Sequence, residues 1–216
     1  FTLNQIPIGI NICEDIWVSD GPIREQAEQG ARLIVNISAS PYRMGVETVR
    51  EQMLSARAKA HQTAIAYVNR VGGQDELVFD GASLIIDSQG GLLARGKSFR
   101  EQVLIADLPL EGFSKRARAG KGFLETSFSQ EKRTRRRPVL SRRLSEEETI
   151  YRALMTGLSD YVRKNQFEKV GIALSGGVDS ALTAVIAVDT LGPAGEGAGA
   201  SRWPASGSAA CWGAGA

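Results

Sequence analysis

The sequence predicts an α/β fold in two parts, and three observations support that prediction. Short apolar runs alternate with stretches of helical composition from Ile6 to Asn69. Several strand-like segments follow them, and a second strand–helix pair flanks Ser175-Gly176-Gly177. Alternation of this kind predicts a sheet covered by helices, with functional residues at the ends of its strands.

The first part of the chain shows the clearest alternation. A helix is predicted over Pro22–Gly30, because Pro favours a first helical turn and Gly a helix end. A second helix is predicted over Val46–His61 from its helical composition. The apolar runs predict strands over Ile6–Cys13, Arg32–Ile37, Ala64–Asn69, Ala82–Asp87, Gly91–Arg95 and Gln102–Leu108. Val71–Asp80 is expected to be a loop. Cys13 ends one strand and Ser40 follows the next, so both lie where α/β folds place their chemistry.

The second part begins with a helix. Ser145 ahead of three glutamates predicts a capped helix start with an acidic first turn. One apolar face is expected on this helix, because four apolar residues recur at helical spacing: Ile150, Leu154, Leu158 and Tyr161. A strand over Lys169–Leu174 and a helix over Ala181–Thr190 follow.

The tight turn between that strand and that helix predicts an anion site. Gly176 and Gly177 let backbone N–H groups converge, and the helix N-terminus adds further N–H groups and a positive dipole end. Ser175 and Ser180 supply hydroxyls for phosphate oxygens. Asp179 would repel a bare phosphate, so it fits only as a helix cap or with a bridging Mg²⁺. The alternative is an ordinary strand-to-helix turn with polar caps.

Cys13 is the candidate nucleophile, although a cysteine at the end of a buried strand is more often a packed apolar residue. Glu14, Asp15 and Trp17 follow it, which is unusual company for an inert thiol. Nearby carboxylates disfavour a thiolate, so a catalytic cysteine here needs a cation and a base from elsewhere in the fold. His61, the only histidine, is expected to be an exposed helix residue rather than a metal ligand.

Length and composition indicate a globular protein. Of the 216 residues, 43% are hydrophobic and 23% are charged, and the net charge is +2. No apolar run approaches the ~20 residues that span a bilayer, so we expect no membrane partner. Two cysteines in unlike contexts favour a reducing cytoplasm. Because the sequence starts at Phe1 without a signal-like segment, we expect a piece of a longer protein.

Two stretches have a biased composition. Between Lys115 and Arg143, eleven basic residues face two acidic ones. We expect a solvated linker there, with a nucleic-acid stripe or a dock for an acidic neighbouring subunit as alternatives. From Pro193 to Ala216, 17 of 24 residues are Gly, Ala or Ser. Disorder is expected in this tail, which is either a native linker or, as we favour, a segment in a lost reading frame.

Several strings resemble known families. Ile10-Asn11-Ile12-Cys13-Glu14-Asp15-Ile16-Trp17 resembles the nucleophile segment of the nitrilase superfamily, and residues 36–42 and 69–81 match its glutaminase branch. The string from Ser175 to Ser180 resembles the pyrophosphate loop of the N-type ATP pyrophosphatases, and it lacks the ending of a Walker loop. Together, over roughly residues 1–192, they resemble the glutamine-dependent NAD⁺ synthetase family.

This resemblance implies a fold and a domain order. Residues 1–112 would be the C-terminal part of a nitrilase-like α-β-β-α sandwich, and residues 113–144 a basic linker. Residues 145–192 would begin a doubly wound parallel-sheet domain of the adenine nucleotide α-hydrolase type. Residues 193–216 would be an atypical tail.

The resemblance also implies an activity. Cys13 would attack glutamine and release ammonia, with Glu14 and Ser40 lining the glutamine pocket. ATP and Mg²⁺ would then activate deamido-NAD⁺ for amidation to NAD⁺. The ATP-binding residues would be Ser175, Gly176, Gly177, Asp179 and Ser180, with Asp179 also positioning the metal. Enzymes of this family assemble into homo-oligomers.

The chain departs from the family pattern before and after its cysteine. The family's general base and oxyanion lysine precede the nucleophile, and the twelve residues before Cys13 contain neither Glu nor Lys. We therefore expect these residues alone to be inactive. Val46 stands where the family usually has a basic residue, so recognition of the glutamine backbone would require Arg43 to substitute for it. Two other functions stay open: a nitrilase-type amidase fused to another ATP-using domain, and an RNA-modifying ATP pyrophosphatase.

Overall fold

The computed structural model describes residues 1–4, 6–108, 125–126, 139–192 and 210–212. Contacts divide the chain into two compact units, one of residues 1–71 and 80–143, the other of residues 72–79 and 144–216. Most of the basic segment and of the Gly/Ala/Ser-rich tail lies outside the described residues. None of the described helices combines the length and the hydropathy of a membrane span.

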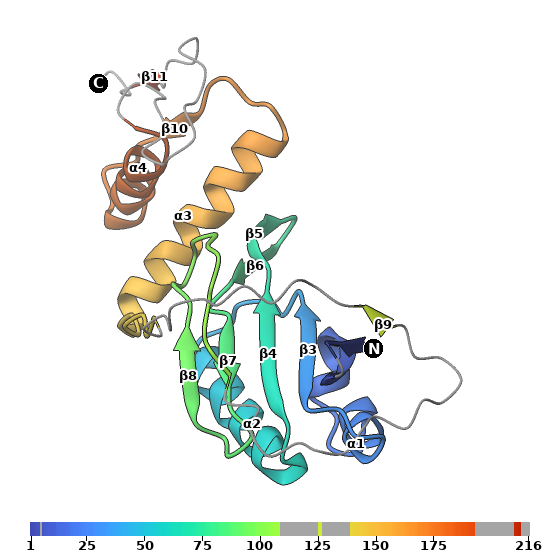
Figure 1. The fold of residues 1–216 in the computed structure, drawn as a ribbon. Coiled ribbons are helices and arrows are strands. Elements are labelled where there is room, and N and C mark those ends of the chain that lie inside the picture. Colours follow the sequence, from blue (N-terminus) through green and yellow to red (C-terminus); the bar gives the residue numbers. More distant parts are fainter. Residues whose placement is uncertain (5, 109–124, 127–138, 193–209, 213–216) are drawn as a thin grey trace. The chain divides into compact units, whose positions relative to one another are not determined.

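A seven-stranded sheet is the centre of the first unit (Figure 1). Its order is β8-β7-β4-β3-β2-β1-β9. The strands are β1 Thr2–Leu3, β2 Ile6–Ile12, β3 Leu33–Ser38, β4 Ala64–Asn69, β7 Leu84–Ile86, β8 Leu92–Arg95 and β9 Glu125–Thr126. The central strands β2, β3 and β4 run parallel, and β7 and β8 continue the sheet antiparallel. This arrangement confirms the α/β class that the alternation predicts.

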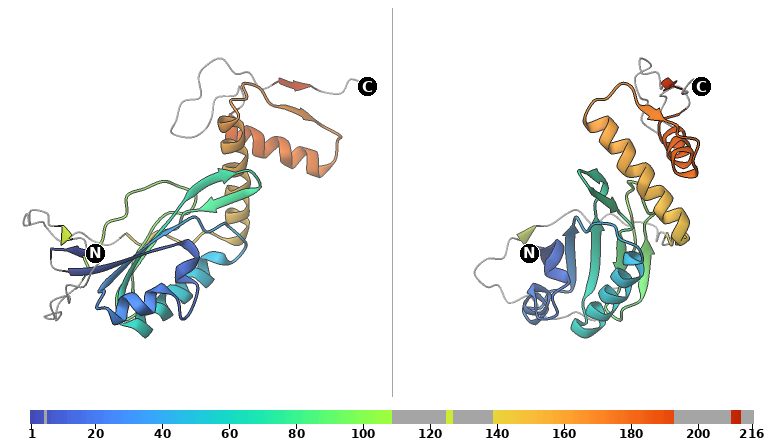
Figure 2. Two further views of the ribbon diagram at one scale, coloured as in Figure 1. Left: turned by 90° about the vertical axis from the view of Figure 1, so that its right-hand side faces the viewer. Right: turned by 180° about the vertical axis from the view of Figure 1, so that it is seen from behind.

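Two helices cover one face of this sheet (Figure 2). They are α1, Pro22–Glu28, and α2, Val46–His61, close to the predicted ranges. The 3₁₀ helix η1, Cys13–Ile16, follows β2 directly. The core between helices and sheet is made of side chains no more than 1% exposed, among them Ile16, Ile23, Ile34, Leu54, Ala58, Ile65, Tyr67, Leu84 and Ile86.

The opposite face of the sheet is apolar and open. Ile10, Ile12, Ile37 and Val68 are 39% to 65% exposed. They alternate along β2, β3 and β4 with the buried residues that face the helices. A sheet with two apolar faces belongs between two layers. The first unit therefore provides one helix layer and one sheet, which is the half of an α-β-β-α sandwich.

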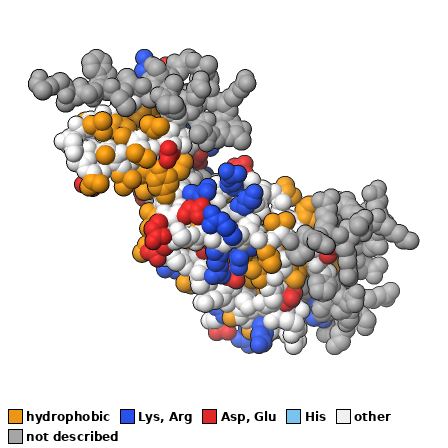
Figure 3. Space-filling view, turned by 90° about the vertical axis from the view of Figure 1, so that its left-hand side faces the viewer, with side chains coloured by type: hydrophobic (Ala, Val, Ile, Leu, Met, Phe, Trp, Pro, Cys, Tyr) orange, Lys and Arg blue, Asp and Glu red, His pale blue; other side chains and the backbone are white. Residues whose placement is uncertain are grey.

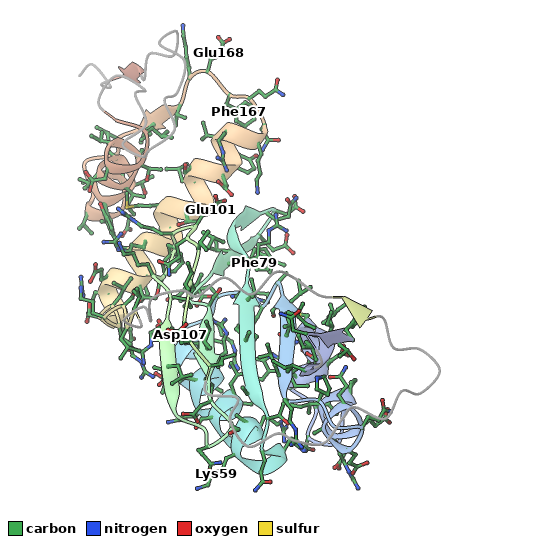
Figure 4. The ribbon with its side chains drawn as sticks, in the orientation of Figure 1. Lys59, Phe79, Glu101, Asp107, Phe167 and Glu168 are labelled. Carbon is green, nitrogen blue, oxygen red and sulfur yellow. The ribbon has the colours of Figure 1, made fainter. Side chains whose placement is uncertain are left out.

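The second unit holds the longest helix. Its elements are α3 Glu146–Lys164, β10 Gly171–Ala173, α4 Val178–Leu191 and β11 Ala210–Trp212, together with a hairpin of β5 Val71–Gln74 and β6 Leu77–Asp80. The Ser145 hydroxyl accepts the Glu148 N–H at 3.2 Å, which confirms the predicted cap. Beyond the end of α3, Phe167 (Figure 4) packs against Tyr161, with ring centroids 5.8 Å apart.

Two predicted elements were wrong. Residues 71–80 are not a loop but the β5–β6 hairpin, whose Phe79 (Figure 4) is only 5% exposed. Gln102–Leu108 forms no strand, and its Val103 is 87% exposed. Apolar alternation alone does not make a strand, because an extended segment also needs a partner for its backbone N–H and C=O groups.

Candidate functional site

The carboxyl ends of three parallel strands meet at one edge of the sheet. Asn11 of β2 pairs in register with Asn36 of β3, and Ser38 of β3 pairs with Asn69 of β4. Cys13 follows β2 directly, so it lies at the same edge. The structure thus brings the predicted nucleophile to the strand ends, as the sequence pattern indicates.

Cys13 has a backbone conformation that is rare for a residue with a side chain. Its φ is +45°, in the left-handed region, and its free thiol is half-buried. Two hydrogen bonds hold the turn: the Ile12 N–H donates to Asp15 Oδ2 at 2.8 Å, and Asn36 Nδ2 donates to the Cys13 carbonyl at 3.4 Å. Strained backbone of this kind persists where the surrounding structure fixes it, and it concentrates at functional sites.

A ladder of buried amides supports this turn from below. Asn36 Nδ2 also donates to Asn11 Oδ1 at 2.7 Å, and both residues are at most 2% exposed. Asn11 donates onward to Gln26 Oε1 of α1 at 3.4 Å, and Gln26 donates to the Ile10 carbonyl at 2.8 Å. Because buried amides are costly without partners, this ladder ties the register of β2 and β3 to α1.

Two hydroxyls lead from the sulfur into the core. Ser38 Oγ donates to Cys13 Sγ at 3.6 Å, and Tyr67 Oη donates to Ser38 Oγ at 2.9 Å. Burial raises the pKa of Tyr67, and the positive charge of Arg50 only partly opposes that shift. Tyr67 is therefore a neutral hydrogen-bond donor at physiological pH.

A buried ion pair lies beside these hydroxyls. Arg50, with no exposed surface, donates to both carboxylate oxygens of Asp80, at 2.9 and 3.1 Å. Burial lowers the pKa of Arg50, but the hydrogen bonds and the charge of Asp80 raise it by more, so the guanidinium stays charged. The Cζ atom of Arg50 also lies 5.5 Å from the centre of the Tyr67 ring.

The predicted glutamine-pocket residues differ in their surroundings. Glu14 is exposed and directly follows Cys13 in η1. Ser40 is buried and hydrogen-bonded: its N–H donates to Asn69 Oδ1 at 2.9 Å, and its hydroxyl accepts from Arg50 at 3.4 Å. Val46 is also buried, whereas Arg43 is exposed. His61 lies half-buried in the last turn of α2 rather than fully exposed.

Sequence reasoning missed Ser38, Arg50, Tyr67 and Asp80. Arg50 could have been detected from the sequence, because it is the one charged residue in a series at i, i+4 spacing along α2. The buried members of this series are Val46, Arg50, Leu54 and Ala58. A charged residue in the centre of an apolar stripe indicates a buried partner of opposite charge. Only the tertiary fold identifies that partner as Asp80.

The phosphate-loop candidate in the second unit is ordered by its own serines. Ser180 Oγ donates to the Gly177 carbonyl at 2.9 Å and accepts the Ser175 N–H at 3.3 Å, and the two serine hydroxyls lie 3.2 Å apart. Gly176 has a φ of +84°, which its lack of a side chain permits. Gly177 is the N-cap of α4. The predicted turn is therefore formed, and these residues are exposed or half-buried.

Asp179 does not cap α4, because Gly177 occupies that position. It lies exposed in the first turn, where its charge suits the helix dipole. In the described part of the chain, no three His, Cys, Asp or Glu side chains gather into a group that could hold a metal ion. Asp179 is thus a single carboxylate beside a turn of backbone N–H groups.

Comparisons with known proteins match both units. The carbon-nitrogen hydrolase family model matches residues 1–118, and the NAD synthase model matches residues 150–201. The glutamine-dependent NAD(+) synthetases of Aquifex aeolicus and Thermotoga maritima are 44% identical over 201 residues and 42% identical over 206. Each alignment covers 88% of this chain and 35% of the relative.

Solved structures agree with these relatives. The glutamine-dependent NAD+ synthetase from Acinetobacter baumannii in complex with ADP is similar with a TM-score of 0.69 and 33% identity, over 86% of this chain and 31% of that one. The chain thus spans about a third of the length of the relatives it matches. By its match over residues 1–118, the chain belongs to the carbon-nitrogen hydrolase family, and a NAD synthase segment follows in the same chain.

Proposed function

We propose that this chain is part of an enzyme that hydrolyses glutamine and uses the ammonia, with ATP, to convert deamido-NAD⁺ to NAD⁺. One observation carries the proposal: a cysteine held in a left-handed turn at parallel strand ends shares a chain with a Gly-Gly turn at a helix N-terminus. A nucleophile that releases ammonia and a loop that binds phosphate are the two parts that an ATP-driven amidation needs. The names of the relatives point to the same pairing.

In the glutaminase half, Cys13 is the proposed nucleophile. Its sulfur attacks the side-chain amide carbon of glutamine, the C–N bond breaks, and the nitrogen leaves as ammonia after taking up a proton. Water then hydrolyses the thioester to glutamate and restores the thiol. Glu14, exposed beside the sulfur, and Ser40, in the loop after β3, line the glutamine pocket in this proposal.

In the synthetase half, the turn before α4 is the proposed binding site for the ATP phosphates. The N-terminus of α4 favours an anion at this turn, and Ser175 and Ser180 place two hydroxyls there. The residues concerned are Ser175, Gly176, Gly177 and Ser180. A carboxylate of deamido-NAD⁺ attacks the α-phosphorus, pyrophosphate leaves, and ammonia then displaces AMP.

Asp179 fits a magnesium ion in this half. Mg²⁺ in nucleotide sites is held by one or two carboxylates, with phosphates and waters as the other ligands, so a single aspartate suffices. When bound, the ion would neutralise part of the negative charge on the phosphates. Asp179 would orient it from the first turn of α4.

We also propose that the protein assembles into a homo-oligomer. Hydrophobic side chains gather on the surface of the second unit (Figure 3). The exposed apolar residues of α4 are Val178, Leu182, Val185 and Val188, between 41% and 80% exposed. Apolar patches of this kind are covered in the assembled protein, either by further chain or by a second copy. Light scattering on the protein that contains this chain measures the assembly.

A cysteine substitution tests the proposed function. In the protein that contains this chain, Cys13→Ala should reduce NAD⁺ formation from glutamine by at least ~1,000-fold, because the nucleophile is lost. Formation of NAD⁺ from added ammonium salt should continue, because Cys13 is needed only to release ammonia from glutamine. Cys211→Ala, the matched control, should change neither rate. Undiminished glutamine-driven synthesis by Cys13→Ala would contradict the proposal.

A further inference from the structure

Building on the proposed function, we propose that Ser38 and Tyr67 are positioning residues for the Cys13 sulfur. They form a chain of hydroxyls that fixes the sulfur in place and donates a hydrogen bond to it. The proposal concerns how the fold prepares the nucleophile before any substrate binds. It therefore depends on the geometry around Cys13 and not on the identity of the amidated product.

The three side chains come from three successive parallel strands. Cys13 follows β2 and Ser38 ends β3. Tyr67 lies in β4, where it pairs in register with Asn36 of β3. Ser38 Oγ lies 3.6 Å from Cys13 Sγ and 2.9 Å from Tyr67 Oη. Ser38 is 6% exposed and Tyr67 is 1% exposed, so water does not compete strongly for these hydroxyls.

The hydrogen bonds run from Tyr67 through Ser38 to the sulfur. Each hydroxyl carries one hydrogen, and Tyr67 uses its own to donate to Ser38. Ser38 thereby has an acceptor site filled, and its single hydrogen is free to point at the sulfur. This hydrogen bond holds the sulfur in one position at the strand ends.

A buried cation anchors the inner end of the chain. Arg50 lies 5.5 Å from the centre of the Tyr67 ring and donates to Ser40 Oγ at 3.4 Å. The Tyr67 hydroxyl interacts with Ser40 as well as with Ser38. Hydrogen bonds in series polarise one another in a low-dielectric interior. The fixed charge of Arg50 thus orients a series of polar groups that ends at Cys13.

A purely structural role would leave the thiol's reactivity unchanged. Buried hydroxyls also need hydrogen-bond partners, and Ser38 and Tyr67 provide them for each other. If that were their whole role, the bond between them would affect the stability of the fold only. Positioning makes a different prediction, because it requires the reactivity of Cys13 to change when the donors are removed while the fold is intact. Alkylation of the thiol measures this without glutamine or ATP.

The test is the rate of Cys13 alkylation by iodoacetamide at one fixed neutral pH. It uses the full chain in a Cys211→Ser background, so that Cys13 is the only thiol. Ser38→Ala should slow alkylation about three- to tenfold, the effect of losing one hydrogen bond of ordinary strength. Ser38→Thr, which keeps a hydroxyl, should restore most of the rate. Tyr67→Phe, which removes one oxygen only, should give an intermediate rate.

Thr63→Val is the matched control for a lost buried hydroxyl. Thr63 is 1% exposed and bonds to the Ala31 carbonyl at 3.3 Å, in the same unit. Its substitution should leave the alkylation rate unchanged, and thermal melting of each variant checks that it is folded. Wild-type rates in Ser38→Ala and Tyr67→Phe would overturn the proposal, and so would equal slowing by Thr63→Val. The alkylation rates do not depend on glutamine or ATP, so they can support the positioning role even if the NAD⁺ assay contradicts the proposed function.

Discussion

At the scale of a single residue, Arg50 is central to the stability of the first unit. It is wholly buried, and its guanidinium bonds to Asp80 and Ser40 and lies beside Tyr67. Removing one partner from such a pair leaves an uncompensated charge in the interior, which is far costlier than losing both partners together.

Asp80→Asn should therefore destabilise the first unit strongly. We expect a loss of about 3–5 kcal/mol in the free energy of unfolding, because Arg50 keeps its charge without a countercharge. Urea unfolding measures the change. Arg24→Ala breaks two exposed ion pairs, with Asp20 and Glu28, and should have no measurable effect. A wild-type value for Asp80→Asn would show that the pair contributes nothing.

The positions of the candidate site residues were predictable from the sequence only where a local motif carries them. Cys13 and the turn from Ser175 to Ser180 depend on neighbouring residues, and the structure forms both as expected. Ser38 and Tyr67 depend on the alignment of β3 with β4, which local sequence does not contain. Their burial is a tertiary fact, so the hydroxyl chain became visible only with the fold.

At the scale of elements, a carboxylate of α3 accepts a backbone hydrogen bond from the β5–β6 hairpin. Asp160 accepts the Gly73 N–H at 2.9 Å and pairs with Arg163 and Lys164 at 2.6 and 3.1 Å. A side chain on Gly72 would meet the Asp160 carboxylate at 2.6 Å, so the approach requires glycine. Lys164 of α3 also donates to the Gly73 carbonyl, so two hydrogen bonds join the hairpin to the helix.

Asp160→Asn should loosen the hairpin in a pH-dependent way. Burial raises the pKa of Asp160, but the Gly73 N–H and the two cations lower it by more. A carboxyl with a lowered folded-state pKa stabilises at neutral pH, and the stabilisation is lost as the pH falls through that pKa, below about 4.

Hydrogen exchange of residues 72–79 measures this effect. At neutral pH, exchange should be about tenfold faster in Asp160→Asn than in the wild type, as one charge-assisted hydrogen bond is weakened. As the pH falls through the lowered pKa of Asp160, the two proteins should converge after correction for intrinsic rates. Asp75→Asn, at the exposed hairpin tip, should match the wild type throughout. A difference that is independent of pH would contradict the role of charge.

Elements were predictable to the extent that they follow local patterns. Pro22 at the start of α1 and the range of α2 agree with the prediction. The hairpin was missed because Gly72-Gly73 is typical of a loop, and its contact with Asp160 lies 87 positions along the chain. Val103 and its neighbours were predicted as a strand, but in the described part of the chain they pair with no other strand, and the apolar pattern alone cannot supply one.

At the scale of the whole molecule, the open face of the sheet is the dominant feature of the first unit. Ile12 and Ile37 are 65% and 56% exposed, on the face away from the helices. Apolar surface on this scale indicates a missing layer, as in the sandwich that the family resemblance implies. The chain alone should therefore self-associate.

Substitution of that face tests this expectation. The double variant Ile12→Thr and Ile37→Thr should lower bis-ANS fluorescence and shift light scattering toward monomer, because threonine keeps strand propensity with less apolar area. Val49→Thr, a singly exposed apolar residue on α2, is the control and should change neither signal. A monomeric wild type with little dye binding would contradict the account of this face.

The central claim is that the two units serve one amide-forming reaction, and nitrogen transfer tests it most directly. The protein that contains this chain is supplied with glutamine labelled with ¹⁵N in its amide, deamido-NAD⁺, ATP and Mg²⁺, and the product is analysed by mass spectrometry. We predict that NAD⁺ carries the label and that AMP and pyrophosphate appear in equal amounts. Unlabelled NAD⁺, or labelled ammonia without consumption of ATP, would contradict the claim.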